Sequence, residues 1–541
     1  MPTATSAWFC PANDLLDLNG LLAAGNMMLP PLAAPRDIAM PSSVRIIALF
    51  VLAAACRSSV PASPLSDTGG AAIWIRDVTL ISPERSAAVP HAHVLIEHGH
   101  ISRVLEQPPG DVSPGATTID GRGRYLVPGL IDGHVHLTEV PGMTPDAAAK
   151  RPDLVEAYYR QLPRSYLYFG FTTVVDLNVV DRPRLDRIRA AAIGPTVLDC
   201  GGALVLANGY PMAYLPSPER FAVSPNFLYD ARQAAAIPAE YRAAEHTPEA
   251  AVARVAAGGG ICVKSYFESG FGAQRGTLPT PTEQLMRDVV AASHRRHLPI
   301  LLHANSLAAH RFAAAVGVDA VAHGLWNWDV PETASLPEQV RRVLDDERRA
   351  GIATMATLRV IGGLADLFSA EFLADPHLAQ ILPRELLDWY RSEDGQWFAR
   401  EMARDFDGLP AEQVHAIFAR TSGAGATAIA YFVSSGGRLV FGSDTPSAPT
   451  YANPPGYNGY LEMVALEKAG IAPRQILVAA TSAAAELFGL AGDLGAIQPG
   501  KRAHLLVLGA DPLLSVTAFD AIETVILGDR VLARADLAAP R

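Results

Sequence analysis

The chain has few lysines and cysteines, and it carries no cluster of basic residues. Only four of its 44 lysine and arginine side chains are lysine, and the formal net charge is -11. Nucleic-acid binding needs cations that neutralise phosphates, and neither a basic cluster nor a basic stripe interleaved with aromatics is visible. Hydrophobic residues make up 49% of the chain and charged residues 18%, which argues against disorder. We therefore predict a well-packed globular protein that does not bind nucleic acid.

Long hydrophobic runs are also missing. The apolar block at residues 46–55 is too short to span a bilayer. It follows Arg45 and ends before Cys56, an arrangement typical of a signal peptide. The segment from Met1 carries three aspartates, whereas Met40 would give a compact basic start. We therefore expect the biological start at Met40, with residues 1–39 an upstream extension from a misassigned start.

The end of this block resembles a bacterial lipobox, in which the cysteine is acylated and becomes the mature N-terminus. The run at residues 52–56 reads Leu-Ala-Ala-Ala-Cys, with Ala53 where leucine is usual. Its small residues equally suit simple signal-peptidase cleavage. We favour a periplasmic or cell-envelope lipoprotein, with secretion as the alternative, and the only membrane contact we predict is a lipid anchor on Cys56. Residues 40–56 are then the signal peptide or lipobox, and the Ser, Pro and Gly-rich residues 57–71 a flexible tether.

Two of the four cysteines, Cys200 and Cys262, lie beyond this region. Two cysteines of an exported protein can pair, but the sequence does not show that these two are close. We predict no essential disulfide.

From residue 129 onward, short apolar runs alternate with helical stretches, the pattern of βα units around a parallel sheet. Eight such runs are present, the number that closes a (β/α)8 TIM barrel, which places this chain in the α/β class. The runs cover residues 130–137, 172–177, 196–199, 261–266, 300–304, 320–324, 352–358 and 439–444.

The two flanks of the predicted barrel contain β-type runs. Residues 72–128 and 493–535 are each too short for a good core, so we expect them to combine into one small β-sandwich-like domain beside a barrel spanning residues 129–492. Two connections, 203–250 and 359–425, are longer than a barrel needs. Both leave from the catalytic face and are either lids and pocket walls or surface decoration.

Polar side chains end five of the predicted strands. His134 and His136 are one residue apart, so one strand directs both imidazoles to the same face. Taken singly, a strand-end histidine is usually hydrogen-bonded structure and a strand-end aspartate a helix cap. Besides the histidine pair, four single residues end strands: Lys264, His303, His323 and Asp444. Burying these six polar groups at one barrel mouth is costly unless a ligand pairs their charges, which indicates a divalent metal.

This order of residues resembles the amidohydrolase superfamily, in the subtype whose two metals are bridged by a carboxylated lysine. Within it, the chain is most similar to imidazolonepropionase-related and prolidase-like hydrolases. The resemblance covers most of residues 72–535, including the flanking runs 127–134, 170–176 and 441–444. It implies two divalent metal ions. Zn2+ is the ion we favour, and Mn2+, Co2+ and Fe2+ are alternatives. His134, His136 and Asp444 would hold one ion, and His303 and His323 the other. A carbamate formed from carbon dioxide on Lys264 would bridge them, since burial favours the neutral amine.

The resemblance also implies a reaction on a small-molecule substrate. A metal-bridging hydroxide would attack the carbonyl of an amide, peptide-like or cyclic amide bond, with Asp444 as general base and then general acid. Tyr266 lies two residues after Lys264 and either hydrogen-bonds the substrate or packs as a rim aromatic. Asn305 is a weaker candidate on the same argument, and we expect His294, His297 and His310 at the surface.

Two alternatives remain. The same two metals could cleave lactones, carboxyl esters or phosphotriesters. A protein of another class, a non-catalytic cell-surface binding lipoprotein, could also keep the fold. The oligomeric state is left open.

Overall fold

The computed structural model describes residues 72–110, 115–215, 219–271, 274–328, 336–406 and 408–540. The predicted signal region, the anchor at Cys56 and the tether lie outside these residues. Among the helices within them, none combines the length and apolarity that a bilayer crossing needs.

All eight strands expected for the barrel are present, in one parallel sheet of three strands and one of five. The first has the order β6-β7-β8 and the second β13-β12-β11-β10-β9. The last three strands are two residues long each and end earlier than predicted, because the chain leaves the ladder to form the loops that carry the site. The strands are β6 (Leu130–Val135), β7 (Phe171–Asp176), β8 (Thr196–Asp199), β9 (Val263–Tyr266), β10 (Ile300–His303), β11 (Ala320–Val321), β12 (Ala353–Thr354) and β13 (Arg438–Leu439).

Backbone contacts join the two sheets on both sides. On one side, the N–H of Asp444 donates to the carbonyl of His134 over 2.8 Å, and Val135 bridges Thr445. On the other, the N–H of Leu204 donates to the carbonyl of Lys264 over 2.8 Å. With helices between successive strands, this is an α/β fold of the TIM-barrel type, as predicted.

The helices between strands begin and end at residues suited to those positions. The side chains of Thr247, Thr282 and Ser306 each accept a hydrogen bond from the first turn of the helix that follows. Helix α7 is capped at its C-terminus by Gly317, whose φ of 76° favours glycine. The helices are α1 (Pro145–Lys150), α2 (Pro152–Tyr168), α3 (Arg182–Arg189), α4 (Arg220–Val223), α5 (Pro248–Ala257), α6 (Glu283–His294), α7 (Leu307–Val316), α8 (Glu338–Ala350), α9 (Leu358–Asp366), α10 (Leu378–Ile381), α11 (Arg384–Arg391), α12 (Trp397–Arg404), α13 (Ala411–Ser434), α14 (Tyr457–Lys468), α15 (Pro473–Val478) and α16 (Ala484–Leu487).

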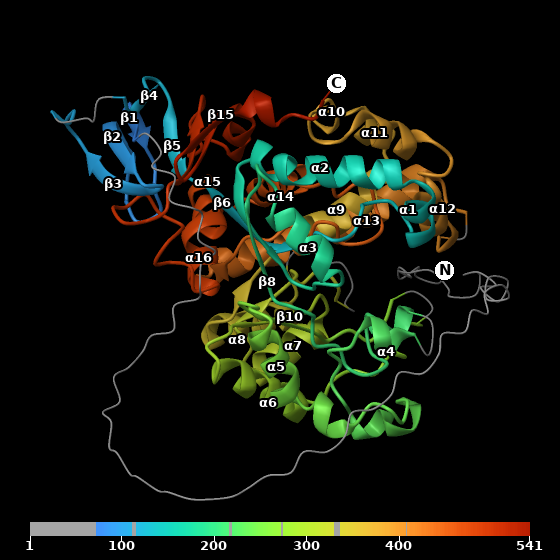
Figure 1. The fold of residues 1–541 in the computed structure, drawn as a ribbon. Helices are drawn as coiled ribbons and strands as arrows, with labels where there is room; N and C mark the ends of the chain where they lie inside the picture. The colour runs from blue at the N-terminus through green and yellow to red at the C-terminus, as the bar shows by residue number, and fades with distance from the viewer. Residues whose placement is uncertain are drawn as a thin grey trace, which may run out of the picture. The chain divides into compact units, whose positions relative to one another are not determined.

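The two flanks of the barrel meet in one eight-stranded sheet with the order β16-β15-β14-β5-β1-β2-β3, and β4 pairs with β1. Figure 1 shows the blue N-terminal strands beside the red C-terminal ones. The sandwich-like form and the boundaries of this domain stay predictions. The strands are β1 (Ile73–Leu80), β2 (Val89–Glu97), β3 (His100–Leu105), β4 (Thr117–Asp120), β5 (Tyr125–Pro128), β14 (His504–Leu508), β15 (Ile522–Leu527) and β16 (Arg530–Ala533).

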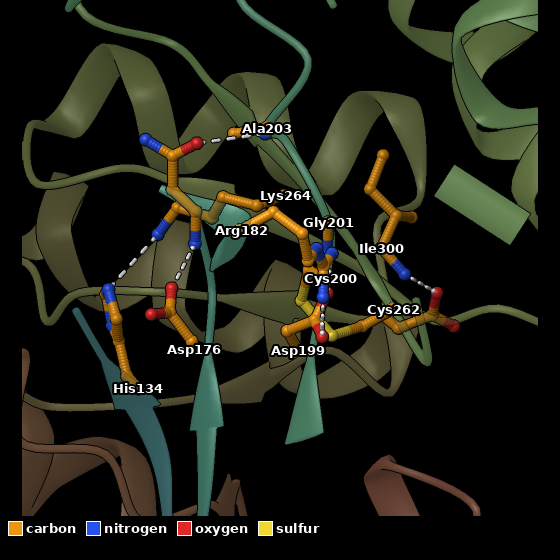
Figure 2. The surroundings of a disulfide bond; sticks show 12 residues. His134, Asp176, Arg182, Asp199, Cys200, Gly201, Ala203, Cys262, Lys264 and Ile300 are labelled. Atoms are coloured by element: carbon orange, nitrogen blue, oxygen red, sulfur yellow. Dashed lines mark hydrogen bonds and ion pairs between the residues drawn. A yellow bond between two sulfur atoms is a disulfide. The ribbon is translucent and has the colours of Figure 1, made fainter. Parts of the chain in front are cut away.

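A disulfide joins Cys200 to Cys262, two cysteines whose proximity the sequence did not show; that the bond is not essential stays a prediction. The two residues are 62 positions apart but their Cα atoms lie 4.5 Å apart, because one follows β8 and the other precedes β9. Both are fully buried. The bond crosses from the three-stranded sheet to the five-stranded sheet, next to Lys264 (Figure 2).

His310 lies in the interior, so the prediction that it is a surface residue is wrong. It faces inward from α7, and its Nδ1 lies 2.8 Å from Oε1 of Glu347 on α8. Both side chains are fully buried. His294 and His297 are exposed, as predicted.

Candidate metal centre

The six polar residues that end the strands line one pocket of about 210 Å3. His136 is half-buried and the other five are buried, with Lys264 only 1% exposed. They come from β6, β9, β10 and the loops that follow β11 and β13, so five separate strands deliver them. The structure therefore brings together every residue that the sequence proposed as a ligand.

Asp444 lies at the centre of this group. Its Oδ1 lies 3.1 Å from Nε2 of His134 and 3.1 Å from Nε2 of His136. Its Oδ2 lies 3.8 Å from Nδ1 of His323. The backbone of Asp444 has a φ of 52°, a conformation uncommon outside glycine that often marks functional sites.

Lys264 reaches the same group from the other side. Its Nζ lies 3.4 Å from Nε2 of His134, and the two side chains point toward one another (Figure 2). Burial lowers the pKa of Lys264 to about 7, although Asp444 opposes the shift. The neutral amine, the form that reacts with carbon dioxide, is thus accessible near neutral pH.

His303 and His323 form the second half of the centre, with ring centroids 4.4 Å apart. Nδ1 of His323 lies 2.9 Å from the hydroxyl of Thr357. Nε2 of His303 lies 3.4 Å from the amide nitrogen of Asn305 and 3.7 Å from Oε2 of Glu268. These contacts engage one ring nitrogen of each histidine and orient the ring, so the other nitrogen is the one suited to a metal.

The residues fit a divalent cation. Four imidazoles and an amine share two carboxylates, Asp444 and Glu268, so nitrogen donors outnumber their acidic partners. Nδ1 of His134 is buried with no hydrogen-bond partner. Burial lowers the pKa of His134 to about 3, which leaves the imidazole neutral, as a ligand must be. Ligand atoms of His134, His323 and Asp444 lie within 4.8 Å of one another. This nitrogen and oxygen donor set is one that zinc and other divalent metals bind.

Two buried aspartates hold the loops that carry the ligands. Asp132 accepts hydrogen bonds from the backbone N–H and the hydroxyl of Ser443, over 2.9 and 2.6 Å, and from the N–H of His134 over 3.2 Å. Asp176 accepts from the N–H of Leu137 over 2.9 Å. Burial raises the pKa of Asp132 to about 7. The sequence analysis missed these roles, although a carboxylate inside an apolar strand is a signal.

Tyr266 and Asn305 lie in the pocket, as their spacing predicted. The ring of Tyr266 packs edge-on against Tyr210, with centroids 5.6 Å apart. Nδ2 of Asn305 donates to Oε2 of Glu268 over 3.2 Å. The alternation that singled out Tyr266 also points to Glu268, which the sequence analysis missed. Contacts with substrate stay a prediction for both Tyr266 and Asn305.

Both long insertions reach the pocket, so they are more than surface decoration. The first contributes Tyr210 and Pro211. The second contributes Val360, Ile361 and Leu364 from α9 and Thr421 from α13.

The family model of the amidohydrolases matches residues 125–325 and 405–532. This is more than half of the chain, which therefore belongs to the amidohydrolase family, as the strand-end residues predicted. The carboxylated-lysine subtype stays a prediction.

Curated relatives match over short segments. Adenine deaminase of Rubrobacter xylanophilus is 35% identical over 86 residues, 16% of this chain and 13% of that protein. D-hydantoinase of Streptomyces coelicolor is 28% identical over 125 residues, 22% of this chain and 25% of that protein. Dihydroorotase of Bacillus caldolyticus is 37% identical over 70 residues, 13% of this chain and 16% of that protein. The matched segments thus span a quarter or less of each relative.

Solved structures match over most of the chain. An amidohydrolase aligns with a TM-score of 0.61 at 23% identity, over 85% of this chain and 99% of that one. A Xaa-Pro dipeptidase with methionine in its active site aligns with a TM-score of 0.59 at 17% identity, over 86% of this chain and 100% of that one. Molinate hydrolase aligns with a TM-score of 0.59 at 19% identity, over 86% and 95%. At these identities the likeness shows the fold.

Proposed function

We propose that this protein is a metal-dependent hydrolase that cleaves a carbon–nitrogen bond in a small molecule, of the amide, peptide-like or cyclic amide type. The observation that carries the proposal is the meeting of His134, His136 and Lys264 around Asp444 in one buried pocket. Membership of the amidohydrolase family supports it. The names of the relatives, among them a hydantoinase and a dihydroorotase, point to the same kind of bond.

In this proposal, His134, His136 and Asp444 would hold one divalent ion, and His303 and His323 would hold the other. Lys264, once carboxylated by carbon dioxide, would supply a negatively charged ligand to the pair. When bound, such ions polarise a carbonyl and make water nucleophilic near neutral pH, and the donor set favours Zn2+.

Asp444 moves the proton. Burial alone would raise its pKa, but the imidazoles of His134 and His136 outweigh burial and hold the pKa well below the ordinary value. The carboxylate is therefore ionised and can accept a proton from the attacking water. The same oxygen can then deliver this proton to the departing nitrogen, so one residue acts as base and as acid.

The test is hydrolysis by the zinc-loaded mature protein of dipeptides, N-acyl amino acids, cyclic amides, lactones, esters and organophosphates. We expect metal-dependent cleavage of carbon–nitrogen bonds that Asp444→Asn slows by at least about 100-fold. Asp153→Asn, which changes an exposed aspartate paired with Arg151, is the matched control and should keep full activity. Cleavage of lactones, esters or phosphotriesters alone would favour the alternative hydrolase. Bound metal without any turnover would favour a binding lipoprotein.

Two further proposals concern the rest of the chain. We retain export with lipidation at Cys56, which a mass shift on the peptide that contains this cysteine would establish. We also retain a barrel domain at residues 129–492 and a composite domain from 72–128 and 493–535, which limited proteolysis at the junctions would reveal.

A further inference from the structure

We propose that the substrate is an uncharged molecule with an aromatic or branched aliphatic group, and that the pocket discriminates against substrates that carry a carboxylate. The proposal rests on the proposed function for the bond that is cleaved. The preference for an uncharged substrate is argued from the residues that line the pocket.

The first observation is the charge of the pocket wall. Among the described residues that line the pocket, Lys264 is the only lysine or arginine, and it lies in the metal centre. The other charged side chains there are Asp444 and Glu139, both acidic. No arginine lines this part of the pocket, although arginine is the chain's main cation. A substrate carboxylate would thus find no cationic partner outside the metal centre.

Two short neighbouring segments add no cation to the wall. Residues 272–273 and 329–335 follow pocket residues closely in sequence, and they contain neither lysine nor arginine. Arg359, beside the pocket residue Val360 on α9, is engaged elsewhere. Its guanidinium donates to Asp366 over 2.5 Å and to Asn458 over 3.2 Å, and Arg359 and Asn458 are both buried.

The second observation is an apolar wall that begins beside the metal centre. The ring centroid of Trp326 lies 5.4 Å from that of His323. Ile361 and Leu364 of α9 and Phe271 also line the pocket. Both α9 residues are buried members of the main hydrophobic core, so this part of the wall is fixed by the fold.

Gly425 of α13 keeps this wall in position. A Cβ atom there would lie 3.2 Å from Cβ of Trp326 and 3.2 Å from Cδ2 of Leu358. This is tighter than ordinary contact, so the absent side chain lets α13 pack directly against the base of the Trp326 side chain.

These two observations select the chemistry of the ligand. Removing an ionised carboxylate from water without a partner is costly, whereas apolar groups gain free energy in proportion to the area that they bury. A benzyl or branched alkyl amide can bury its apolar group against the wall, whereas a free amino-acid carboxylate would lose its hydration there without gaining a cationic partner. This class is narrower than the peptide-like substrates expected from the sequence.

The test uses two ketones that lack the carbon–nitrogen bond to be cleaved, so binding is measured apart from catalysis. Benzylacetone has the shape of N-benzylacetamide, with a methylene in place of the amide N–H, and its analogue carries a carboxylate on the benzylic carbon. Calorimetry on the zinc-loaded full chain should show benzylacetone binding at least about tenfold more tightly, or 1.4 kcal/mol. Equal or tighter binding of the carboxylate would overturn the proposal, and so would a failure to bind benzylacetone.

Variants of the pocket wall test whether the missing cation causes the preference for the uncharged ketone. Thr421, half-buried on α13, lines the pocket, and Thr421→Arg should bring the ratio of the two dissociation constants close to one. Thr421→Leu, which adds bulk without charge, should keep the tenfold preference. If Thr421→Arg does not fold, Val360→Arg provides the same test. An unchanged ratio in a folded arginine variant would overturn the proposal.

Hydrolysis separates the two proposals. N-benzylacetamide and benzyl acetate differ only in the bond to be cleaved. If neither is hydrolysed while the ketone preference holds, the proposed function fails and the charge inference stands. If both N-benzylacetamide and N-acetylphenylglycine are hydrolysed with the charged member preferred, the charge inference fails alone.

Discussion

Two buried groups of histidines in this protein relate to carboxylates in different ways. His310 faces Glu347 one to one over 2.8 Å, between α7 and α8. The candidate metal centre instead groups four imidazoles and an amine with two carboxylates, Asp444 and Glu268, and it opens to a pocket. In the first group one histidine meets one carboxylate, whereas in the second the nitrogen donors outnumber the carboxylates. The ratio of donors to acceptors, together with a cavity, separates a structural histidine from a functional one.

The largest effect is expected on catalysis, when the carboxylate of the metal centre is removed. Asp444→Asn removes the proton acceptor and a proposed ligand, so kcat should fall by about 10²- to 10⁴-fold, the range of general acid–base catalysis. Glu347→Gln is the matched control and should retain kcat, because Glu347 lies outside the pocket lining. Steady-state kinetics on the best substrate measures both. Activity of Asp444→Asn within tenfold of the parent protein contradicts the role of Asp444.

The His310–Glu347 pair, in contrast, is expected to affect stability and not catalysis. Glu347→Leu leaves His310 buried without its acidic partner, and breaking such a pair costs about 3–5 kcal/mol of unfolding free energy. The double change His310→Leu with Glu347→Leu should recover most of this loss, because neither side chain then needs a partner. Urea denaturation compares the variants with the parent. If the double variant is no more stable than Glu347→Leu, the pairing is not what stabilises this region.

The disulfide beside Lys264 is expected to act on stability more than on catalysis. Replacing Cys200 and Cys262 by alanine should lower the unfolding free energy by about 2–4 kcal/mol. Turnover per folded molecule should change little, because the ladder between β9 and β10 also positions Lys264. Denaturation with and without reductant measures the effect. Equal stability in both conditions contradicts a stabilising bond.

A smaller effect, on the pH dependence of stability, is expected at His377. This histidine is half-buried, so it adds an intermediate case to the two buried groups. Burial lowers its pKa, but Asp520 and Asp375, 3.1 and 2.7 Å away, outweigh burial and raise the pKa above 6.5. The folded state therefore binds this proton more tightly than the unfolded state. The stabilisation is complete below pH 6.5 and is lost as the pH rises through the raised pKa.

For such a partly exposed ion pair we expect at most about 1 kcal/mol. The fall in unfolding free energy across this pH window should be steeper in the parent protein than in His377→Gln. Identical pH profiles would contradict the assignment.

Local patterns in the sequence were enough to predict the proposed ligands. A histidine pair at period two, and single polar residues that end apolar runs, indicate strand ends that share one edge of a barrel. The pairing of residues distant in sequence left no such trace. His310 and Glu347 lie on different helices, and Cys200 and Cys262 are 62 positions apart, so only the fold reveals these contacts.

The pocket wall was also beyond prediction. Ile361 and Leu364 read as ordinary core residues of a helical insertion, and only the packing of α9 against α13 places them beside the metal centre. The last three strands were predicted too long, because apolar residues continue into the loops that follow. Apolar patterning reports burial, and it does not report where a hydrogen-bonded ladder ends.

The most direct test of the central claim is anomalous X-ray scattering at the zinc edge from crystals of the zinc-loaded protein. The account predicts two peaks in the pocket, one among His134, His136 and Asp444 and one beside His303 and His323, with density for a carbamate on Lys264 between them. A pocket without ions, in crystals that bind zinc elsewhere or not at all, would contradict it.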